Sequence, residues 1–196
     1  TLMDEQALNS GDAAYDWTSY KSIYDSKGNL NNTNWINQMF KNTKTENYVL
    51  GITGGTSAST YAISLGYYNE GGIVGGPKAS NYDRYNFRVN MEQKLYGDFL
   101  KVGENVGLAW VRSRGIGVGN MYNNTLRGAY ATSPLQAEYI QDGRDDLNNG
   151  YNYSKSTDWY QYDGNPVAVL YRNRNISDNQ NWTANVYAEI QPIKNL

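Results

Sequence analysis

The stretch Thr60-Tyr61-Ala62-Ile63-Ser64-Leu65-Gly66-Tyr67 alternates large apolar side chains with small or polar ones. A period of two residues is that of a β-strand with one apolar and one polar face. The pattern returns at Tyr85-Asn86-Phe87-Arg88-Val89, at Val106-Gly107-Leu108-Ala109-Trp110 and at residues 182–190. Tyr or Trp tends to close the apolar stripe at one end, which is typical of the aromatic girdle of a transmembrane barrel.

Composition agrees with such a barrel. Hydrophobic residues make up 39% of the 196 residues and charged residues 18%, both below the usual share in a soluble domain. No stretch reaches the roughly 20 apolar residues of a helical membrane span. The predicted fold class is all-β, as part of a large transmembrane antiparallel β-barrel, because such strands turn every second side chain to a wet lumen.

The connections between the predicted strands alternate in length, as they do in outer-membrane barrels with short periplasmic turns and long outer loops. The chain divides into an outward loop and lead-in at 1–45, four antiparallel strands within 46–112, a long extracellular loop at 113–180, and a fifth strand with a periplasmic turn at 181–196. The strands themselves are predicted at about residues 47–54, 59–69, 83–95, 99–112 and 181–191.

Five strands cannot close a barrel, since the smallest membrane barrels use about eight. The sequence also shows no signal peptide and no plug-like segment before the strands. We therefore expect the chain to be a piece of a longer polypeptide.

Several functions are disfavoured by composition. The chain has no cysteine and no histidine, so a disulfide scaffold is excluded and the commonest general base and metal ligand are missing. A net charge of −2 offers no basic footprint for nucleic acid. We predict no catalytic residue, no metal and no cofactor, and hence no enzyme.

A set of motifs in fixed order resembles SusC/RagA-type TonB-linked outer-membrane proteins. No single motif is specific, but their order across residues 34–196 is. The motifs are Asn34-Trp35-Ile36-Asn37-Gln38-Met39-Phe40, Asn47-Tyr48, the Gly54-Gly55 turn, Thr60-Tyr61 with Ser64-Leu65-Gly66-Tyr67, Tyr82-Asp83-Arg84-Tyr85-Asn86-Phe87-Arg88-Val89-Asn90, Leu100-Lys101-Val102-Gly103-Glu104-Asn105 and Asn165-Pro166-Val167-Ala168.

The resemblance implies a 22-stranded barrel around an N-terminal plug, in the outer membrane of a Gram-negative, Bacteroidetes-like bacterium. It implies import of oligosaccharides or peptides with TonB-derived energy, together with a SusD-like surface lipoprotein. Further expected partners are the rest of the barrel and plug, membrane lipids and lipopolysaccharide. The TonB contact would lie outside this chain, and the sequence leaves glycan and peptide cargo both open.

Two groups of residues are candidates for binding ligand. Trp159, Tyr160 and Tyr162 lie late in the long loop, where aromatic faces could stack on a sugar or peptide. Packing of the loop onto itself or onto a partner is the alternative. Arg84, Asn86 and Arg88 form a polar stripe expected to face the lumen, where they would contact cargo, the plug or carboxylates of neighbouring strands.

Four other sequence features predict local structure and not a binding site. Gly115-Ile116-Gly117-Val118-Gly119 lacks the Gly-Lys-Ser/Thr of a P-loop and is interpreted as a flexible loop. Asp142, Asp145 and Asp146 lack EF-hand spacing and suit an ordinary turn. Residues 132–139 predict a short helix with Ser133 as N-cap. Glu104 falls on the apolar parity of its strand, which places the strand's start near the rim or indicates a bulge.

Two other classes of protein remain as alternatives. A soluble carbohydrate-binding β-sandwich is also all-β and rich in aromatic residues, but it needs no aromatic girdle and seldom has such a long loop. An outer-membrane lipase or protease would need a nucleophile with a base, and no such spacing is present.

Overall fold

The computed structural model describes residues 2–14, 16, 20–97, 99–119, 124–141, 151–154 and 164–193. These residues form two compact units. The first, which we call the loop unit, comprises the described residues of Thr1–Met39 and Val118–Val169. The second, the sheet unit, comprises those of Phe40–Gly117 and Leu170–Leu196.

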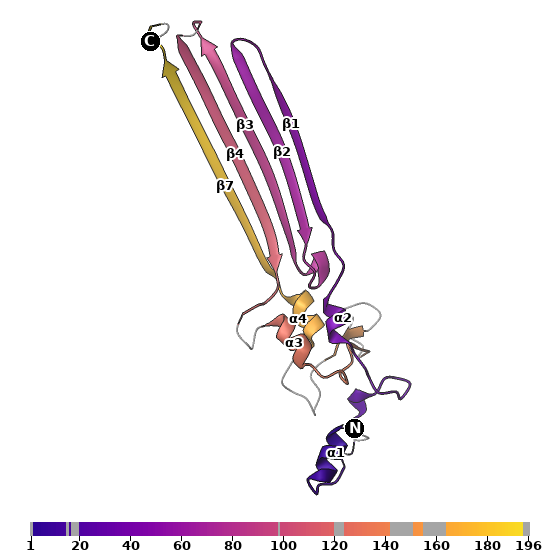
Figure 1. Ribbon diagram of the computed structural model, residues 1–196. Helices are drawn as coiled ribbons and strands as arrows, with labels where there is room; N and C mark the ends of the chain where they lie inside the picture. The colour runs from indigo at the N-terminus through magenta and orange to yellow at the C-terminus, as the bar shows by residue number, and fades with distance from the viewer. Residues whose placement is uncertain are drawn as a thin grey trace. The chain divides into compact units, whose positions relative to one another are not determined.

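The sheet unit is built on one antiparallel sheet with the strand order β1-β2-β3-β4-β7 (Figure 1). Two tight turns join β1 to β2 and β3 to β4 at one end, and β7 ends there too, whereas the longer connections leave from the opposite end (Figure 1). We call these the turn end and the loop end. The strands are β1 (Thr45–Gly55), β2 (Ser59–Gly71), β3 (Asn81–Leu95), β4 (Leu100–Gly115) and β7 (Asn175–Ile190).

The register confirms the predicted separation into two faces. Leu65 lies opposite Phe87, which lies opposite Leu108, and Leu108 lies opposite Trp182. One residue away, Ser64 lies opposite Arg88, and Arg88 opposite Gly107. Because directly paired residues point to the same side of a sheet, one face is apolar and the other polar over most of its length.

The strands are longer than the sequence pattern indicates. β4 continues to Gly115 instead of ending at Arg112, and β7 begins at Asn175 instead of near Asn181. The added part of β7, residues 175–180, is almost wholly polar, so no apolar alternation marks it. It is held in the sheet by pairing with Trp110–Gly115 of β4.

The two short turns are stabilised locally. In the first, the Thr56 hydroxyl accepts hydrogen bonds from the backbone N–H groups of Ala58 and Ser59, both at 3.2 Å. In the second, Tyr96 and Gly97 take positive φ values of 57° and 72°. Glycine adopts that conformation without strain, whereas Tyr96 is a rarer case.

The sheet has no core of its own. No buried hydrophobic side chain among the described residues lies in β1, β2, β3, β4 or β7, although these strands carry many large apolar residues. Within the described part of the chain, β1 and β7 each pair along one side only. Both the apolar face and the two edges therefore need surroundings that the described residues do not supply.

The loop end of the sheet unit has a small packed cluster. Val74, Ala79 and Leu170 are buried there, beside the short 3-10 helix η3 (Gly76–Lys78). The Arg114 guanidinium donates hydrogen bonds to the carbonyl oxygens of Asn173 at 2.9 Å and Tyr171 at 3.3 Å, and a further one to that of Lys78. Arg114 thus joins the end of β4 to segments distant in sequence.

The loop unit joins the N-terminal residues to the segment between β4 and β7. Trp35 donates from Nε1 to the carbonyl oxygen of Ser133 at 2.9 Å, and the Thr33 hydroxyl donates to that of Gln136 at 2.7 Å. Trp35 and Met39 are buried. The elements of this unit are α1 (Leu2–Asn9), η2 (Lys21–Ile23), α2 (Trp35–Met39), α3 (Thr125–Ala131), β5 (Tyr139–Gln141), β6 (Tyr151–Tyr153) and the start of α4 (Pro166–Arg172).

The helix predicted at residues 132–139 is wrong. The helix of this region is α3, which begins after Asn124, whose side chain accepts from the Arg127 N–H at 3.0 Å, and ends at the C-cap Thr132. Ser133 instead accepts from the Leu135 N–H, and its carbonyl closes a single turn with the Gln136 N–H. The Ser-Pro pair therefore begins a single turn and not a helix.

None of the helices in the described ranges has the length and apolar character needed to cross a membrane. Besides the five-stranded sheet, the described residues contain only the two three-residue strands β5 and β6. A β-sandwich requires a second sheet broad enough to cover the first, so the structure does not support that alternative.

Candidate ligand-binding face of the sheet

Arg84, Asn86 and Arg88 lie together on the polar face of β3, as the sequence predicts. Directly across from Asn86 lie Gly66 on β2 and Ala109 on β4. Arg88 lies between Ser64 and Gly107 in the same way. These small neighbours form a shallow floor on the polar face, and the side chains of Asn86 and Arg88 project from the sheet above it.

A hollow of about 420 Å³ lies over this floor. Its volume falls within the usual range for a small-molecule site. Hydroxyl, amide and guanidinium groups line it, which are groups that bind polyhydroxylated or peptide ligands. Its polar lining is Ser64, Asn86, Arg88, Asn105, Asn181 and Thr183.

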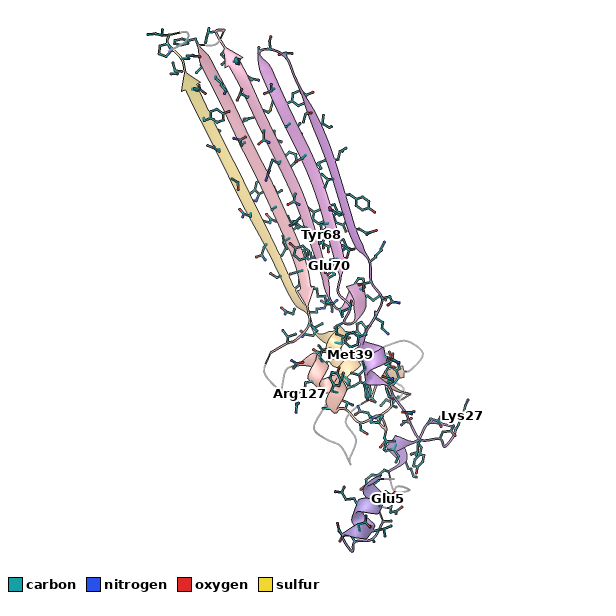
Figure 2. All side chains as sticks on the ribbon, in the orientation of Figure 1. Glu5, Lys27, Met39, Tyr68, Glu70 and Arg127 are labelled. Carbon is teal, nitrogen blue, oxygen red and sulfur yellow. The ribbon has the colours of Figure 1, made fainter. Side chains whose placement is uncertain are left out.

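Arg84 belongs to an aromatic cluster nearer the loop end. It pairs with Tyr68, and its guanidinium carbon lies 5.7 Å from the centre of the Tyr68 ring. Tyr82 meets that ring edge-on at 6.0 Å between centres. The Tyr68 hydroxyl donates to Glu70 Oε2 at 2.8 Å, and Figure 2 places Tyr68 and Glu70 toward the loop end of the sheet. The ring is therefore fixed at both its face and its hydroxyl.

The charged groups of the polar face near the turn end are paired with one another. Lys101 Nζ lies 3.1 Å from Glu92 Oε2 and 3.6 Å from Glu189 Oε2. Tyr187 donates to Glu92 at 3.0 Å, and its ring lies over Gly103, where any side chain would collide with it. Arg84 and Arg88, by contrast, make no hydrogen bond or ion pair with a described residue.

An aromatic belt crosses the apolar face. It consists of Tyr48, Tyr67, Tyr85 and Trp110, one from each of four adjacent strands. Their ring centres are 6.3, 5.0 and 5.3 Å apart in that order. A shallow apolar groove of about 620 Å³ lies among these rings and the aliphatic side chains beside them. Its lining suits hydrocarbon better than polar cargo.

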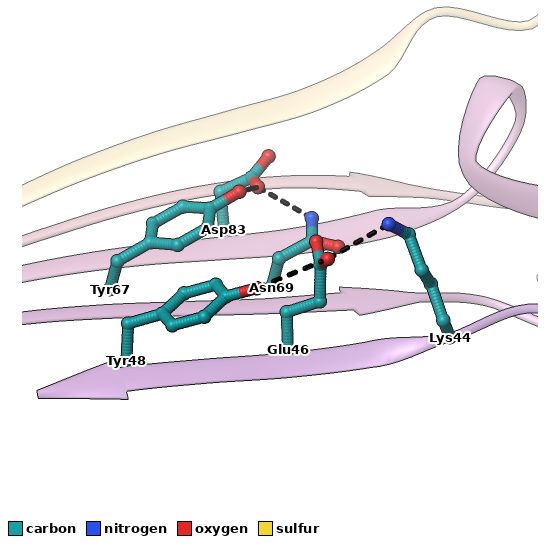
Figure 3. Close-up of polar contacts among 6 residues, drawn as sticks. All are labelled: Lys44, Glu46, Tyr48, Tyr67, Asn69 and Asp83. Atoms are coloured by element: carbon teal, nitrogen blue, oxygen red, sulfur yellow. Dashed lines mark hydrogen bonds and ion pairs between the residues drawn. The ribbon is translucent and has the colours of Figure 1, made fainter.

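A polar row follows the belt on its loop-end side and receives its hydrogen bonds (Figure 3). Asp83 accepts from the Tyr67 hydroxyl at 3.3 Å and from Asn69 Nδ2 at 2.7 Å. Glu46 lies 2.8 Å from Lys44 Nζ, and this bond to the carboxylate raises the pKa of Lys44. Aromatic rings with their polar atoms turned to a hydrated row are typical of a membrane interface.

Glu104 lies on the apolar face without a bulge. It is paired with Met91 of β3 and Val186 of β7 in an uninterrupted register. Because β4 begins at Leu100, the carboxylate lies in the part of the strand nearest the turn end. Of the two sequence interpretations, the bulge is wrong, and proximity of the strand's start to the rim stays a prediction.

The other predicted ligand residues, Trp159, Tyr160 and Tyr162, lie outside the described residues, as do Asp142, Asp145 and Asp146. The described ranges contain no group of three or more acidic, histidine or cysteine side chains placed to hold a metal ion.

Sequence reasoning missed part of the polar face. Asn105, Asn181 and Thr183 share the hollow with Arg88, and Tyr68 supports Arg84. The parity of each strand would have assigned them to the polar face, but only the register between strands places them beside the stripe.

The fold and the two unlike faces define the class of this protein, which is part of a transmembrane antiparallel β-barrel. No protein-family model matches the chain. It is 30% identical to the TonB-dependent receptor SusC of Bacteroides thetaiotaomicron over 145 residues, which are 69% of this chain and 13% of that receptor. It is 29% identical to the TonB-dependent receptor P26 of Formosa agariphila over 163 residues, 82% of this chain and 14% of that receptor.

Solved structures agree in fold. A structure of the RagAB peptide transporter aligns with 98% of this chain and 21% of that chain, at a TM-score of 0.57 and 21% identity. A structure of the RagAB peptide importer in the closed-closed state aligns with 98% of this chain and 23% of that chain, at a TM-score of 0.59 and 19% identity. The resemblance to SusC/RagA-type TonB-dependent transporters is confirmed, and the chain spans about a seventh of the curated relatives' length. These relatives are named as receptors and transporters, in agreement with a chain that is no enzyme.

Proposed function

We propose that the chain is part of an active importer in the outer membrane of a Gram-negative, Bacteroidetes-like bacterium. Its cargo would be oligosaccharides or peptides, moved with energy from the TonB system through regions outside this chain. A SusD-like lipoprotein would cover the outer opening. The observation that carries the proposal is the register of the five strands, which collects apolar residues on one face and polar residues on the other.

The two faces have different roles in this proposal. The apolar face contacts lipid, with the aromatic belt at the outer interface beside lipopolysaccharide, and the polar face lines the lumen together with the rest of the barrel and the plug. Arg84, Asn86 and Arg88 contact cargo in the lumen. Glycan is favoured as cargo by the amide- and hydroxyl-lined hollow, and peptide is the second candidate, since a RagAB structure is named a peptide importer.

The segment predicted from about Gly115 to Asn179, which the structure limits to residues 116–174 between β4 and β7, is proposed to form an outward cap that touches cargo and the lipoprotein partner. Its length exceeds that of a simple connection, and long loops in compact folds are usually functional or disordered. Aromatic side chains bind at low entropic cost, because each fixes only two torsions. Trp159, Tyr160 and Tyr162 are the residues assigned to this contact.

The test is uptake by the complete transporter in living cells. Alanine at Trp159, Tyr160 and Tyr162 should weaken cargo uptake or co-purification of the lipoprotein while barrel assembly, followed by heat-modifiable gel mobility, is retained. Tyr130→Ala, which removes a well-exposed aromatic ring of the same unit, is the matched control. A triple variant that imports cargo and co-purifies with the lipoprotein like the parent would show that these three residues contact neither of them.

A further inference from the structure

The stacked pair Arg84–Tyr68 has a binding capacity that the described residues do not use. A guanidinium that lies over an aromatic ring keeps the N–H donors of its planar edge available. None of these donors makes a hydrogen bond or ion pair with a described residue, although the guanidinium lies over the Tyr68 ring, 5.7 Å from its centre. A fixed cation with unused donors is suited to bind an anion.

The charges around the pair favour an anion as well. Arg88 stands four residues further along the same face of β3, about 14 Å away at about 3.4 Å per residue. Asn86 is the only side chain of that column between them. Glu92, further along the column, is neutralised by Lys101 at 3.1 Å. Glu70 also lies on this face and accepts from the Tyr68 hydroxyl at 2.8 Å, so two arginines stand beside one carboxylate. The middle of the polar face therefore keeps a net positive charge, which attracts and orients anions.

The chemistry of the pair points to a particular anion. Two parallel N–H donors of a guanidinium match the two oxygens of a carboxylate. The edge-on Tyr82 ring and the Tyr68 ring offer apolar surface beside that point, which suits the carbon skeleton to which a carboxylate is attached. The hollow over Gly107, with its amide and hydroxyl lining, continues from there toward the turn end.

We infer that Arg84, supported by Tyr68 and Tyr82, binds a carboxylate of the cargo, and that Asn86, Arg88 and the adjoining hollow hold the remainder of the molecule. The inference rests on the proposed importer function and narrows it to acidic cargo. The carboxylate belongs either to an acidic sugar unit or to a peptide, and the two sources are separated by the test below.

The test measures equilibrium binding to the purified complete transporter by isothermal titration calorimetry. The probes are oligogalacturonates and their methyl esters, and a tetra-alanine peptide and its C-terminal amide. Each pair differs only in the free carboxylate. The parent should bind one acid more tightly than its capped analogue, and the pair that shows this difference identifies the source.

The variants are Arg84→Gln, Arg84→Lys and the control Arg112→Gln. Arg84→Gln should raise the Kd for the acid by about tenfold or more, because a charge-assisted bond is lost, and should leave the capped probe unchanged. Arg84→Lys should restore part of the affinity, since it keeps the charge but not the planar fork. Arg112 lies opposite Asp83, on the other face of the sheet, so its variant should bind like the parent.

Three results would overturn the inference. One is a parent that binds capped and free probes equally, and another is an Arg84→Gln variant with parental affinity for the acid. The third is an Arg84→Gln variant that keeps the parent's preference for the free acid over the capped probe but whose barrel, without ligand, melts at a lower temperature. Such a result would mean that Arg84 pairs with another segment of its own polypeptide and not with cargo. Uptake by energised cells separates the two proposals. If cells import only the capped probes, the importer function stands and the carboxylate site is refuted. If the protein binds the acid but cells import none of the probes, the carboxylate site stands and the importer function is refuted.

Discussion

Trp110 of β4 donates a hydrogen bond from its indole Nε1 to Asp178 Oδ1 of β7, at 2.5 Å. The two residues are not direct partners, since Trp110 pairs with Gln180 and Asp178 with Arg112. The bond therefore runs diagonally, from the aromatic belt toward the loop end. It turns the polar edge of the indole toward the loop end, where the polar residues of the same face lie, in the orientation expected of a ring at a membrane interface.

Removing the acceptor of this bond should weaken the barrel modestly. Asp178→Ala is expected to lower the free energy of unfolding of the complete protein by about 0.5–1.5 kcal/mol, the usual net value of one hydrogen bond. Asp178→Asn keeps an acceptor and should stay close to the parent. Urea unfolding in lipid vesicles measures both variants, and equal losses for the two would show that charge, and not the bond to Trp110, matters at this position.

The two faces of the sheet should respond in opposite ways to a new charge. Ile63, paired with Val89, lies on the apolar face, whereas its neighbour Ala62, paired with Asn90, lies on the polar face. Ile63→Arg should cost about 2–4 kcal/mol if it lies near the bilayer midplane. Ala62→Arg should be tolerated, because the lumen is wet.

The measurement is again urea unfolding of the complete protein in vesicles, with heat-modifiable gel mobility as a check on assembly. Similar losses for both variants would contradict the assignment of one face to lipid and the other to the lumen.

The faces could be predicted from the sequence because strand parity is a local property. Tyr61, Ile63 and Leu65 follow one another at every second position, and a slip by one residue would invert the whole set. The start of β7 could not be predicted in this way, since residues 175–180 have a single apolar side chain, Ile176, and depend on pairing with β4. Strand ends at a hydrated rim lose the apolar signal.

Contacts between distant segments were beyond the sequence pattern for a different reason. Asp178 lies 68 residues after Trp110, and only the register of β4 with β7 brings them together. The same holds for Tyr68 and Arg84, which parity assigns to one face without placing them side by side. The stripe of Arg84, Asn86 and Arg88 was predictable, while its aromatic support was not.

Acid should loosen the turn that contains Asp25 in the loop unit. The Asn29 N–H donates to the Asp25 carboxylate at 2.8 Å, and this bond, together with those from the Asn29 side chain and the Lys27 N–H, lowers the pKa of Asp25 below its usual 3.8. A carboxyl whose pKa is lower in the folded state stabilises that state above its unfolded pKa. This stabilisation is lost as the pH falls through the lowered value.

Amide hydrogen exchange at residues 27–29 between about pH 2 and pH 6, corrected for the intrinsic rate, would detect this change. The protection of these amides should fall on acidification in the parent and stay nearly flat in Asp25→Asn, which keeps a neutral acceptor. Equal pH profiles for the two proteins would remove Asp25 as the cause.

Trp35 should hold the loop unit together without being needed for barrel assembly. It is 3% exposed, and its Nε1 donates to the Ser133 carbonyl oxygen at 2.9 Å. Trp35→Ala removes both the packing and the bond, and a buried Trp replaced by Ala typically costs about 3–5 kcal/mol. Trp35→Phe removes the donor but keeps an aromatic ring, so its cost should be smaller.

Limited proteolysis of intact cells tests this, because the residues between β4 and β7 would be cut faster once the loop unit opens. Trp35→Ala should show the faster cleavage, Trp35→Phe an intermediate rate, and the exposed control Tyr130→Ala the parental rate. All three should retain the gel mobility of a folded barrel, because none of the buried hydrophobic side chains among the described residues lies in the five strands of the sheet. A Trp35→Ala barrel that failed to assemble would mean that the loop unit forms before the sheet and guides its pairing.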